Sequence, residues 1–360
     1  MTVDSPPPSH PSKKTVPSPL PGRLIVQMGR WVWSTLWHVM MSQLAPRDAK
    51  GAYIRPPSLF RHWIIADDSA ERTTIGGDTV ANDALTYTAA ANRYRLYVGM
   101  GCPWAHRTLV VRCLKGLTEA IAITVVVPSV NEGGWIFETL EQGCHSLKEL
   151  YALAYPGYQG RATVPVLWDS QTQTIVNNES ADIIAILNES FNAIAQNPHL
   201  DLYPDDLKAT IDQWNEKIYH TVNNGVYRCG FAQSQGAYDQ ACDQLFATLD
   251  EVDGVLANQR YLCGASLTLA DVRLFTTLFR FDLVYYGLFK CDRRRIQDYA
   301  YLGPYLRDIY QLPGIAHTCD ADAVRRDYYG NLFPLNPSQI IPHGPDPGYL
   351  MVPHHRYPLD

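Results

Sequence analysis

The fold of this chain is decided by one stretch, YVGMGCPWAHR at residues 97–107. Residues 93–98 alternate apolar and polar side chains, as a β-strand does. Pro103 lacks a backbone N–H and suits the first turn of a helix, and apolar residues then recur at helical spacing up to Gly116. Cys102 therefore lies where a strand ends and a helix begins. Unpaired backbone N–H groups and the positive end of the helix dipole meet there, so we expect a reactive thiolate.

The surrounding sequence predicts an α/β domain. The expected elements, in chain order, are a strand at 93–98, a helix at 103–117, a strand at 121–127, a long loop, a helix around 146–153, strands at 164–168 and 174–177, and a helix from Ser180 to about Asn188. This order describes the thioredoxin fold. Pro165 lies inside an apolar strand, which is typical of a cis bond or an edge. In the thioredoxin fold a cis-proline faces the active-site cysteine.

From Tyr203 onward the periodicity is helical only, which predicts an all-helical second domain. Helices are expected at 207–222, 238–256, 268–289 and 304–311, and Thr268 with Asp271 forms a variant of the capping box. We predict five segments: an N-terminal extension (1–44), an arm and loop (45–92), a thioredoxin-like domain (93–195), a helical substrate domain (203–330) and an extended C-terminal tail (331–360).

Composition narrows the classes of function. The chain has 360 residues and a formal net charge of −6, which argues against nucleic-acid binding. Its eight cysteines show no metal-ligand spacing, and Ala105 occupies the position that a Cys-x-x-Cys pair would need. We therefore expect no metal site, no bound cofactor and a reducing cytoplasm. A small thiol such as glutathione would then resolve any intermediate formed on Cys102.

The N-terminal extension has two parts. Residues 1–22 are rich in proline and serine, which predicts a disordered tail. Residues 24–44 contain tryptophan and methionine, but polar side chains interrupt them too often for a membrane span. We expect this segment to pack against the protein's own body. An amphipathic helix on a membrane or partner surface is the alternative.

An ordered set of motifs runs through residues 45–345. It comprises CPWAHR (102–107), GWIF (134–137), VPVLWD (164–169), NES (178–180), GVYRCGFA (225–232), YLRD (305–308) and DYY (327–329). This set resembles the glutathionyl-hydroquinone reductases, the Xi class of the glutathione transferases. The chain departs from that family at Glu138, Arg228 and Asp327, where Asp, Lys and His are usual. These departures concern the substrate pocket and the surface.

The resemblance implies an activity, namely glutathione-dependent reduction of glutathionyl-hydroquinones through a Cys102–glutathione mixed disulfide. Glutathione is then a co-substrate, and the resemblance also implies a homodimer. By their positions in the family's motifs, the implied catalytic residues are Cys102, Tyr227 and Tyr328; the glutathione-binding residues are Trp135, Val164, Pro165, Glu179 and Ser180; and further substrate contacts are Tyr285, Lys290 and Tyr329. We also expect positive charge on His106 or Arg107 to lower the pKa of the Cys102 thiol. The alternative is that both residues have a structural role.

Two other functions stay open at this point. An omega-like thiol transferase or dehydroascorbate reductase shares the Cys-Pro start. A non-enzymatic ligand carrier or membrane-associated relative is favoured only by residues 24–44.

Overall fold

The computed structural model describes residues 21–66, 87–129 and 131–356, and the chain divides after Leu44 into two units. Residues 1–20 of the predicted disordered tail and most of the predicted loop within 45–92 lie outside these ranges, and a helix begins at Gly22. The first unit contains helix α1, Gly22–Leu44. Within the described residues, no helix is long and apolar enough to cross a membrane. The packing expected for this segment stays a prediction.

The second unit is built on a six-stranded sheet with the order β6-β5-β4-β3-β7-β8. Strand β3 (Tyr94–Val98) pairs in parallel with β4 (Ala122–Ser129) and antiparallel with β7 (Val166–Asp169). Strand β8 (Thr174–Asn177) completes the β7 hairpin. The alternating apolar side chains of β3 place Tyr94 and Leu96 in the core. This is the predicted thioredoxin-like arrangement.

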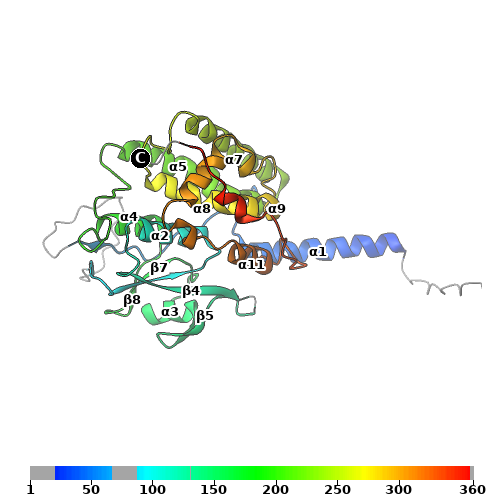
Figure 1. Ribbon diagram of the computed structural model, residues 1–360. Coiled ribbons are helices and arrows are strands. Elements are labelled where there is room, and N and C mark those ends of the chain that lie inside the picture. Colours follow the sequence, from blue (N-terminus) through cyan, green and yellow to red (C-terminus); the bar gives the residue numbers. More distant parts are fainter. Residues whose placement is uncertain (1–20, 67–86, 130, 357–360) are drawn as a thin grey trace, which may run out of the picture. The chain divides into compact units, whose positions relative to one another are not determined.

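Helices cover the two faces of the sheet (Figure 1). Helices α2 (Pro103–Leu114) and α4 (Ser180–Glu189) pack together, and α2 also packs against α8 of the helical domain. Helix α3 (Leu147–Ala154) lies against β5, β6 and β8 on the other face. The N-terminal end of α2, where Cys102 lies, is therefore held between the sheet and the helical domain.

One prediction about this domain is wrong. The long loop expected after β4 contains two strands, β5 (Gly134–Glu141) and β6 (Cys144–Ser146). Gly133 adopts a positive φ of 67° and its N–H bonds Ser129 O, which closes a hairpin between β4 and β5. Gly133 therefore lies in the turn between two strands. Much of β5 is exposed, so its sequence resembles that of a loop.

A short arm runs along the edge of β8. The Asn178 N–H donates to Phe60 O at 3.0 Å, and the Phe60 N–H donates to the side-chain Oδ1 of Asn178 at 3.1 Å. The His62 N–H donates to Val176 O at 3.0 Å. The arm ends in β1 (Ile64–Ile65), which pairs in parallel with β2 (Tyr87–Thr88). These contacts bring residues 55–60 beside the start of α4.

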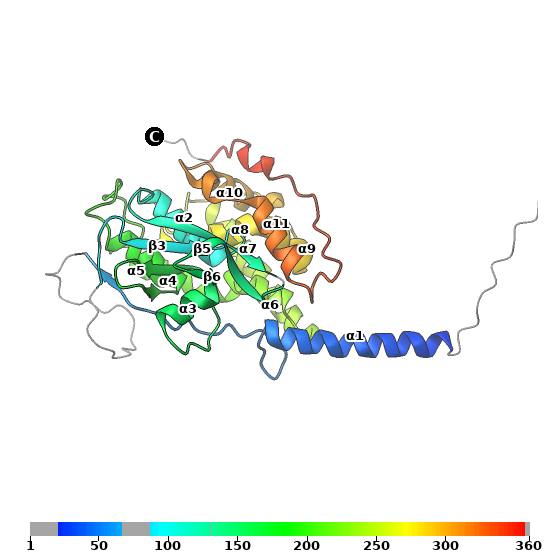
Figure 2. The same cartoon turned by 90° about the horizontal axis from the view of Figure 1, so that it is seen from below.

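Residues 208–331 are mainly helical, as predicted for the second domain. Its α-helices are α5 (Lys208–Ile218), α6 (Gly225–Gly230), α7 (Gln235–Leu256), α8 (Leu269–Arg280), α9 (Tyr286–Leu288), α10 (Leu302–Tyr310) and α11 (Ala321–Asn331). Two π-helical turns, η1 (Tyr219–Asn223) and η2 (Phe281–Tyr285), interrupt them, and the short 3-10 turns are η3 (Ile296–Asp298), η4 (Ile315–Thr318) and η5 (Pro347–Met351). Helices α6 and α11, both labelled in Figure 2, were not expected. Helix α11 packs against η2 and β4.

Candidate active site

Cys102 occupies the N-cap position of α2. Its backbone is extended, with φ −78° and ψ 120°, and Pro103 begins the helix. Its thiol lies 3.7 Å from the carbonyl oxygen of Val164. The Val164–Pro165 peptide bond is cis. The structure thus brings together Cys102, Val164 and Pro165, as the sequence predicted.

The net pKa of the Cys102 thiol differs from the sequence-based expectation. Burial raises this pKa, while the backbone N–H groups of Ala105 and Trp104 and the charges of Arg280 and Arg55 each lower it. The N-terminal donors are present as expected, but removal from water disfavours the thiolate more strongly. The helix terminus lowers the pKa of Cys102 as expected, but the net direction is upward because burial outweighs it.

His106 supplies no positive charge to this thiol. Nη1 of Arg280 lies 2.9 Å from its Nδ1, and the Thr318 hydroxyl lies 2.9 Å from its Nε2. Burial and the neighbouring guanidinium lower the pKa of His106 well below its usual value. A guanidinium only donates, so Nδ1 accepts and the ring is neutral. The charge expected on His106 is therefore absent.

Arg280 is a site residue that sequence reasoning missed. It is buried at the end of α8 and donates to the carbonyl oxygens of Met100 and Gly101, both at 2.8 Å. These contacts fix the loop before Cys102 and place a guanidinium near the thiol. A single arginine within the apolar stretch LFTTLFRFDLV (274–284) was the available signal, because a buried charge needs dedicated partners.

Asp327 contacts the same loop from α11. Its Oδ2 accepts the Gly101 N–H at 3.0 Å. A Cβ on Gly101 would lie 2.3 Å from that oxygen, so the approach requires glycine. Burial raises the pKa of Asp327 to about 6. The backbone beside Cys102 is thus held on one side by Arg280 and on the other by Asp327.

Three tyrosine hydroxyl groups converge near this loop. The Tyr328 hydroxyl lies 2.5 Å from that of Tyr227 and 2.9 Å from that of Tyr285. They come from α11, α6 and η2. Burial raises the pKa of Tyr227 and Tyr328 well above the usual value, and that of Tyr285 to about 12. All three are therefore neutral hydroxyl groups near pH 7 and can donate hydrogen bonds.

The structure distinguishes Tyr328 from Tyr329. Only Tyr328 joins the hydroxyl cluster, while the Tyr329 hydroxyl lies close to Gly287 in α9. Lys290 has an exposed side chain and a positive φ of 61°, and its carbonyl accepts the Tyr238 hydroxyl. No contact recorded among the described residues joins Lys290 to the cluster, so the structure does not bring it to this site.

Trp104 connects the cysteine to the tyrosines. Its ring stacks on Tyr227 with centroids 6.4 Å apart and an interplanar angle of 24°. Guanidinium groups of Arg55 and Arg107 lie 3.7 and 4.4 Å from its centroid. Cys102 also contributes electrostatically to the raised pKa of Tyr227, which is consistent with their proximity.

Glu179 and Ser180 form the start of α4. Glu179 is the N-cap, and its side chain accepts the Ala181 N–H at 3.2 Å and the Ser58 hydroxyl at 2.9 Å. Burial opposes its ionisation, but Arg55 and these donors outweigh burial and lower the pKa of Glu179. The result is a carboxylate beside helix N–H groups.

Trp135 comes from the unexpected strand β5. Its ring lies over Gly99, where an added Cβ would approach the ring to 2.4 Å. Gly99 is therefore required for the indole to reach the loop before Cys102. Trp135 therefore lies against the loop that leads to the Cys102 thiol.

Two family models match the chain. One is described as the glutathione S-transferase N-terminal domain and matches residues 101–190. The other is described as the glutathione S-transferase C-terminal domain and matches residues 235–308. Both fall on the two domains predicted from the sequence pattern, which confirms the predicted fold class of a thioredoxin-like domain followed by an all-helical one.

Relatives and solved structures match over most of the chain. The glutathionyl-hydroquinone reductase YqjG of Escherichia coli is 45% identical over 322 residues, covering 87% of this chain and 93% of that protein. Its glutathione-bound structure has a TM-score of 0.75 at 46% identity, covering 83% of this chain and 96% of that one. The glutathione transferase Xi structure from Phanerochaete chrysosporium has a TM-score of 0.76 at 41% identity, covering 84% and 95% of the two chains.

Proposed function

Because this chain belongs to the glutathionyl-hydroquinone reductases, the Xi class of the glutathione transferases, we propose that it reduces glutathionyl-hydroquinones with Cys102 as the nucleophile. The observation that carries this proposal is the convergence of one thiol, a cis-proline and three neutral tyrosine hydroxyl groups. A thiol next to hydroxyl donors suits the displacement of a sulfur substituent from a phenolic ring.

The first step is a nucleophilic displacement at the thioether sulfur of the substrate. The Cys102 thiolate attacks the glutathionyl sulfur, and the carbon–sulfur bond to the ring breaks. The ring carbon keeps the electron pair and takes a proton, so hydroquinone leaves. Cys102 and glutathione are left joined as a mixed disulfide. Raised pKa values keep the Tyr227 and Tyr328 hydroxyl groups protonated, and such donors stabilise charge that develops on a hydroquinone oxygen.

The second step regenerates the enzyme. The thiolate of a second glutathione attacks the mixed disulfide, releasing glutathione disulfide and the Cys102 thiolate. Each turnover consumes one free glutathione, whose sulfur and the glutathionyl sulfur of the substrate become the disulfide. The two electrons released when this disulfide forms reduce the ring carbon, which exchanges its bond to sulfur for a bond to hydrogen. One nucleophilic thiol suffices.

Glutathione would be held by the groups around the thiol. The backbone of Val164, next to Pro165, would pair with the cysteinyl segment of the peptide. Glu179 would bind the γ-glutamyl ammonium group, and Ser180 with the N-terminal N–H groups of α4 would bind its carboxylate. Trp135 would line the part of the glutathione site next to the glutathione sulfur.

The testing experiment is turnover of a glutathionyl-hydroquinone with excess glutathione, with products separated by chromatography. The wild type should yield hydroquinone and glutathione disulfide, and Cys102→Ala should yield neither. Cys113→Ala is a matched control, since Cys113 is also on α2 and partly exposed but bonds Pro313 O at 3.8 Å instead. Activity on a glutathionylated peptide alone would contradict the proposal and indicate an omega-like thiol transferase.

We also propose a homodimer in a reducing cytoplasm. All eight cysteines are free thiols, which suits such a compartment. Gel filtration with light scattering tests the assembly, and a mass equal to one chain would contradict the dimer.

A further inference from the structure

Helix α1 has one narrow polar face. Arg23, Gln27, Arg30, Ser34 and His38 follow each other at intervals of four, three, four and four residues. At about 100° per residue, this spacing places all five on one stripe of the helix. A polar stripe that runs from Arg23 to His38 indicates a helix with one side in water.

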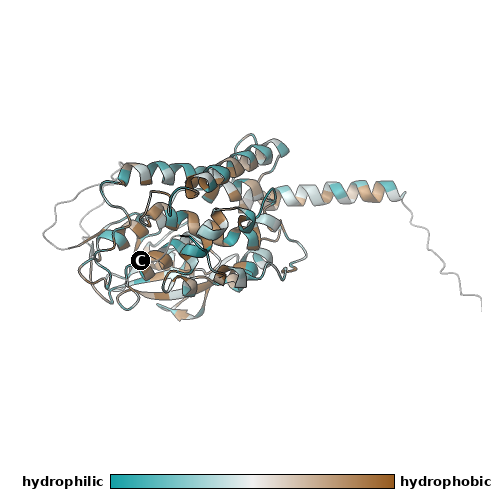
Figure 3. Ribbon diagram, turned by 45° about the horizontal axis from the view of Figure 1, so that its top comes forward, coloured by the Kyte–Doolittle hydropathy of each residue, from teal (hydrophilic) through white to brown (hydrophobic). Residues whose placement is uncertain are grey.

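The remaining circumference is mainly apolar. Nine large apolar side chains lie outside the polar stripe: Leu24, Ile25, Val26, Met28, Trp31, Val32, Trp33, Leu36 and Val39. Figure 3 shows hydrophobic and hydrophilic residues interspersed along this helix. The triplets 24–26 and 31–33 are apolar throughout, so the apolar surface is broader than a coiled-coil seam, whose flanks are polar.

Hydroxyl groups outside the polar stripe are satisfied within the helix. The Thr35 hydroxyl donates to Trp31 O at 2.9 Å, and the Ser42 hydroxyl donates to Val39 O at 2.7 Å. Hydroxyl groups bonded to their own backbone cost less to remove from water than unpaired ones. These positions are therefore compatible with an apolar surrounding.

The charge of this helix is purely positive. Arg23 and Arg30 are its ionised side chains, and the helix contains no Asp or Glu, whereas the whole chain carries −6. Cations on the polar face and tryptophan on the apolar face are typical of helices that lie in the headgroup region of anionic bilayers. The helix is not apolar enough to span one.

We propose that α1 binds the surface of an anionic lipid bilayer, lying in the interface with its apolar side chains toward the acyl chains and its arginines at the headgroups. The charge and the tryptophans of α1 fit an anionic bilayer, and the protein's own body stays the other covering expected from the sequence. The proposal is independent of the chemistry at Cys102.

Vesicle co-sedimentation of the full-length protein tests this. We expect binding to vesicles of phosphatidylcholine with phosphatidylserine, little binding to phosphatidylcholine alone, and release by salt. Arg23→Gln with Arg30→Gln should weaken binding to anionic vesicles by about tenfold or more. Trp31→Ser with Trp33→Ser should weaken it similarly, whereas the matched polar changes Gln27→Ala and Ser34→Ala should not.

Turnover of the glutathionyl-hydroquinone should be the same in all these variants, which shows that the second unit is folded. Equal binding of wild type and arginine variants, or no binding to either vesicle, would overturn the proposal. Self-association that requires Trp31 and Trp33, without vesicle binding, would assign the face to a second copy of the chain instead.

Discussion

At the scale of single residues, Arg280 connects several groups around the thiol. It fixes the carbonyls of Met100 and Gly101, bonds His106, and its charge lowers the pKa of Cys102. Arg280 acts on Cys102 by holding the preceding loop in place and by the electric field of its positive charge. It is therefore a positioning residue.

Replacing Arg280 tests this role. Arg280→Met removes a buried positive charge, so the pKa of Cys102 should rise further and alkylation by iodoacetamide at pH 7 should slow by about tenfold. Arg280→Lys keeps the charge without the planar fork, and should preserve the alkylation profile while lowering kcat. Identical pH profiles of alkylation for the wild type and Arg280→Met would contradict the role.

Asp327 gives a pH-dependent prediction. Its pKa of about 6 in the folded protein exceeds the usual 3.8, so the folded chain binds this proton more tightly than the unfolded chain. Its contribution to stability is full below about pH 4 and is lost as the pH rises through about 6. Asp327→Asn should therefore raise the free energy of unfolding at pH 7.5 by about 1–3 kcal/mol, with little change at pH 4.

Urea unfolding at the two pH values measures this effect. Asparagine still offers an acceptor to the Gly101 N–H. Asp322→Asn on the same helix is the control, because Asp322 is exposed and pairs only with Arg325 among the described ion pairs. An equal change at both pH values would show that the effect of Asp327→Asn is not protonation.

At the scale of elements, a network of buried hydrogen bonds stabilises the start of α8. Asp271 is buried and accepts the N–H groups of Leu262 and Thr268, the Thr268 hydroxyl and the Tyr305 hydroxyl. The predicted capping box is confirmed, and the structure adds α10 as a partner. The box therefore joins a helix start to a neighbouring helix and to the preceding turn.

Asp271→Ala should destabilise the protein by about 3 kcal/mol or more, because four donors lose a buried acceptor. Chemical denaturation measures the loss. Asp239→Ala in α7 is the control, since Asp239 is exposed and bonds Gln235 within its own helix. Similar losses in the two variants would mean that the buried network adds nothing beyond helix propensity.

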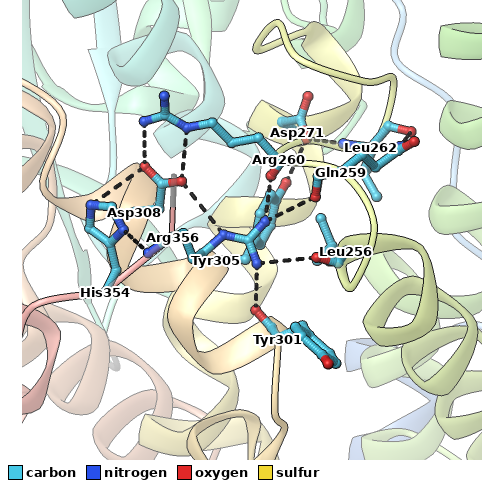
Figure 4. A network of polar contacts seen from close by, with 10 residues as sticks. All are labelled: Leu256, Gln259, Arg260, Leu262, Asp271, Tyr301, Tyr305, Asp308, His354 and Arg356. Carbon is cyan, nitrogen blue, oxygen red and sulfur yellow. Dashed lines mark hydrogen bonds and ion pairs between the residues drawn. The ribbon is translucent and has the colours of Figure 1, made fainter. Parts of the chain in front are cut away.

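At the scale of the whole molecule, the C-terminal segment is tied back to the helical domain (Figure 4). Arg356 donates to Arg260 O at 2.7 Å, to Tyr301 O and Gln259 O at 3.2 Å, and to Leu256 O at 3.5 Å. Asp308 lies beside it and receives a bidentate ion pair from Arg260. One buried guanidinium thus joins segments about a hundred residues apart in sequence.

Arg356→Met should free this segment and leave several buried carbonyls unpaired, at a cost of about 2–4 kcal/mol. Limited proteolysis should then cut within residues 332–356 faster than in the wild type, and the Tm should fall. Arg294→Met is the control, because Arg294 is exposed and bonds Asp298 O nearby. Unchanged cleavage would show that other contacts hold the segment.

The amino-acid sequence determined those structural features that depend on residues adjacent in the chain. Strand β3, the Pro103 start of α2, the cis bond at Pro165 and the capping box at Thr268 each follow from the preferences of a few adjacent side chains. The motif set also identified the family and thereby Cys102, Glu179 and the tyrosines as candidates. Their assignment to roles stays a proposal.

The pKa of Cys102 and the contacts around it follow from the packing of residues that are distant in the sequence. The pKa of Cys102 depends on burial between two domains, and Arg280 and Asp327 approach its loop from helices more than 170 residues away. Tyr328 rather than Tyr329 enters the hydroxyl cluster because η2 and α6 meet α11 on that side. Hydration and the distances between charges are properties of the packed chain, so adjacent residues do not encode them.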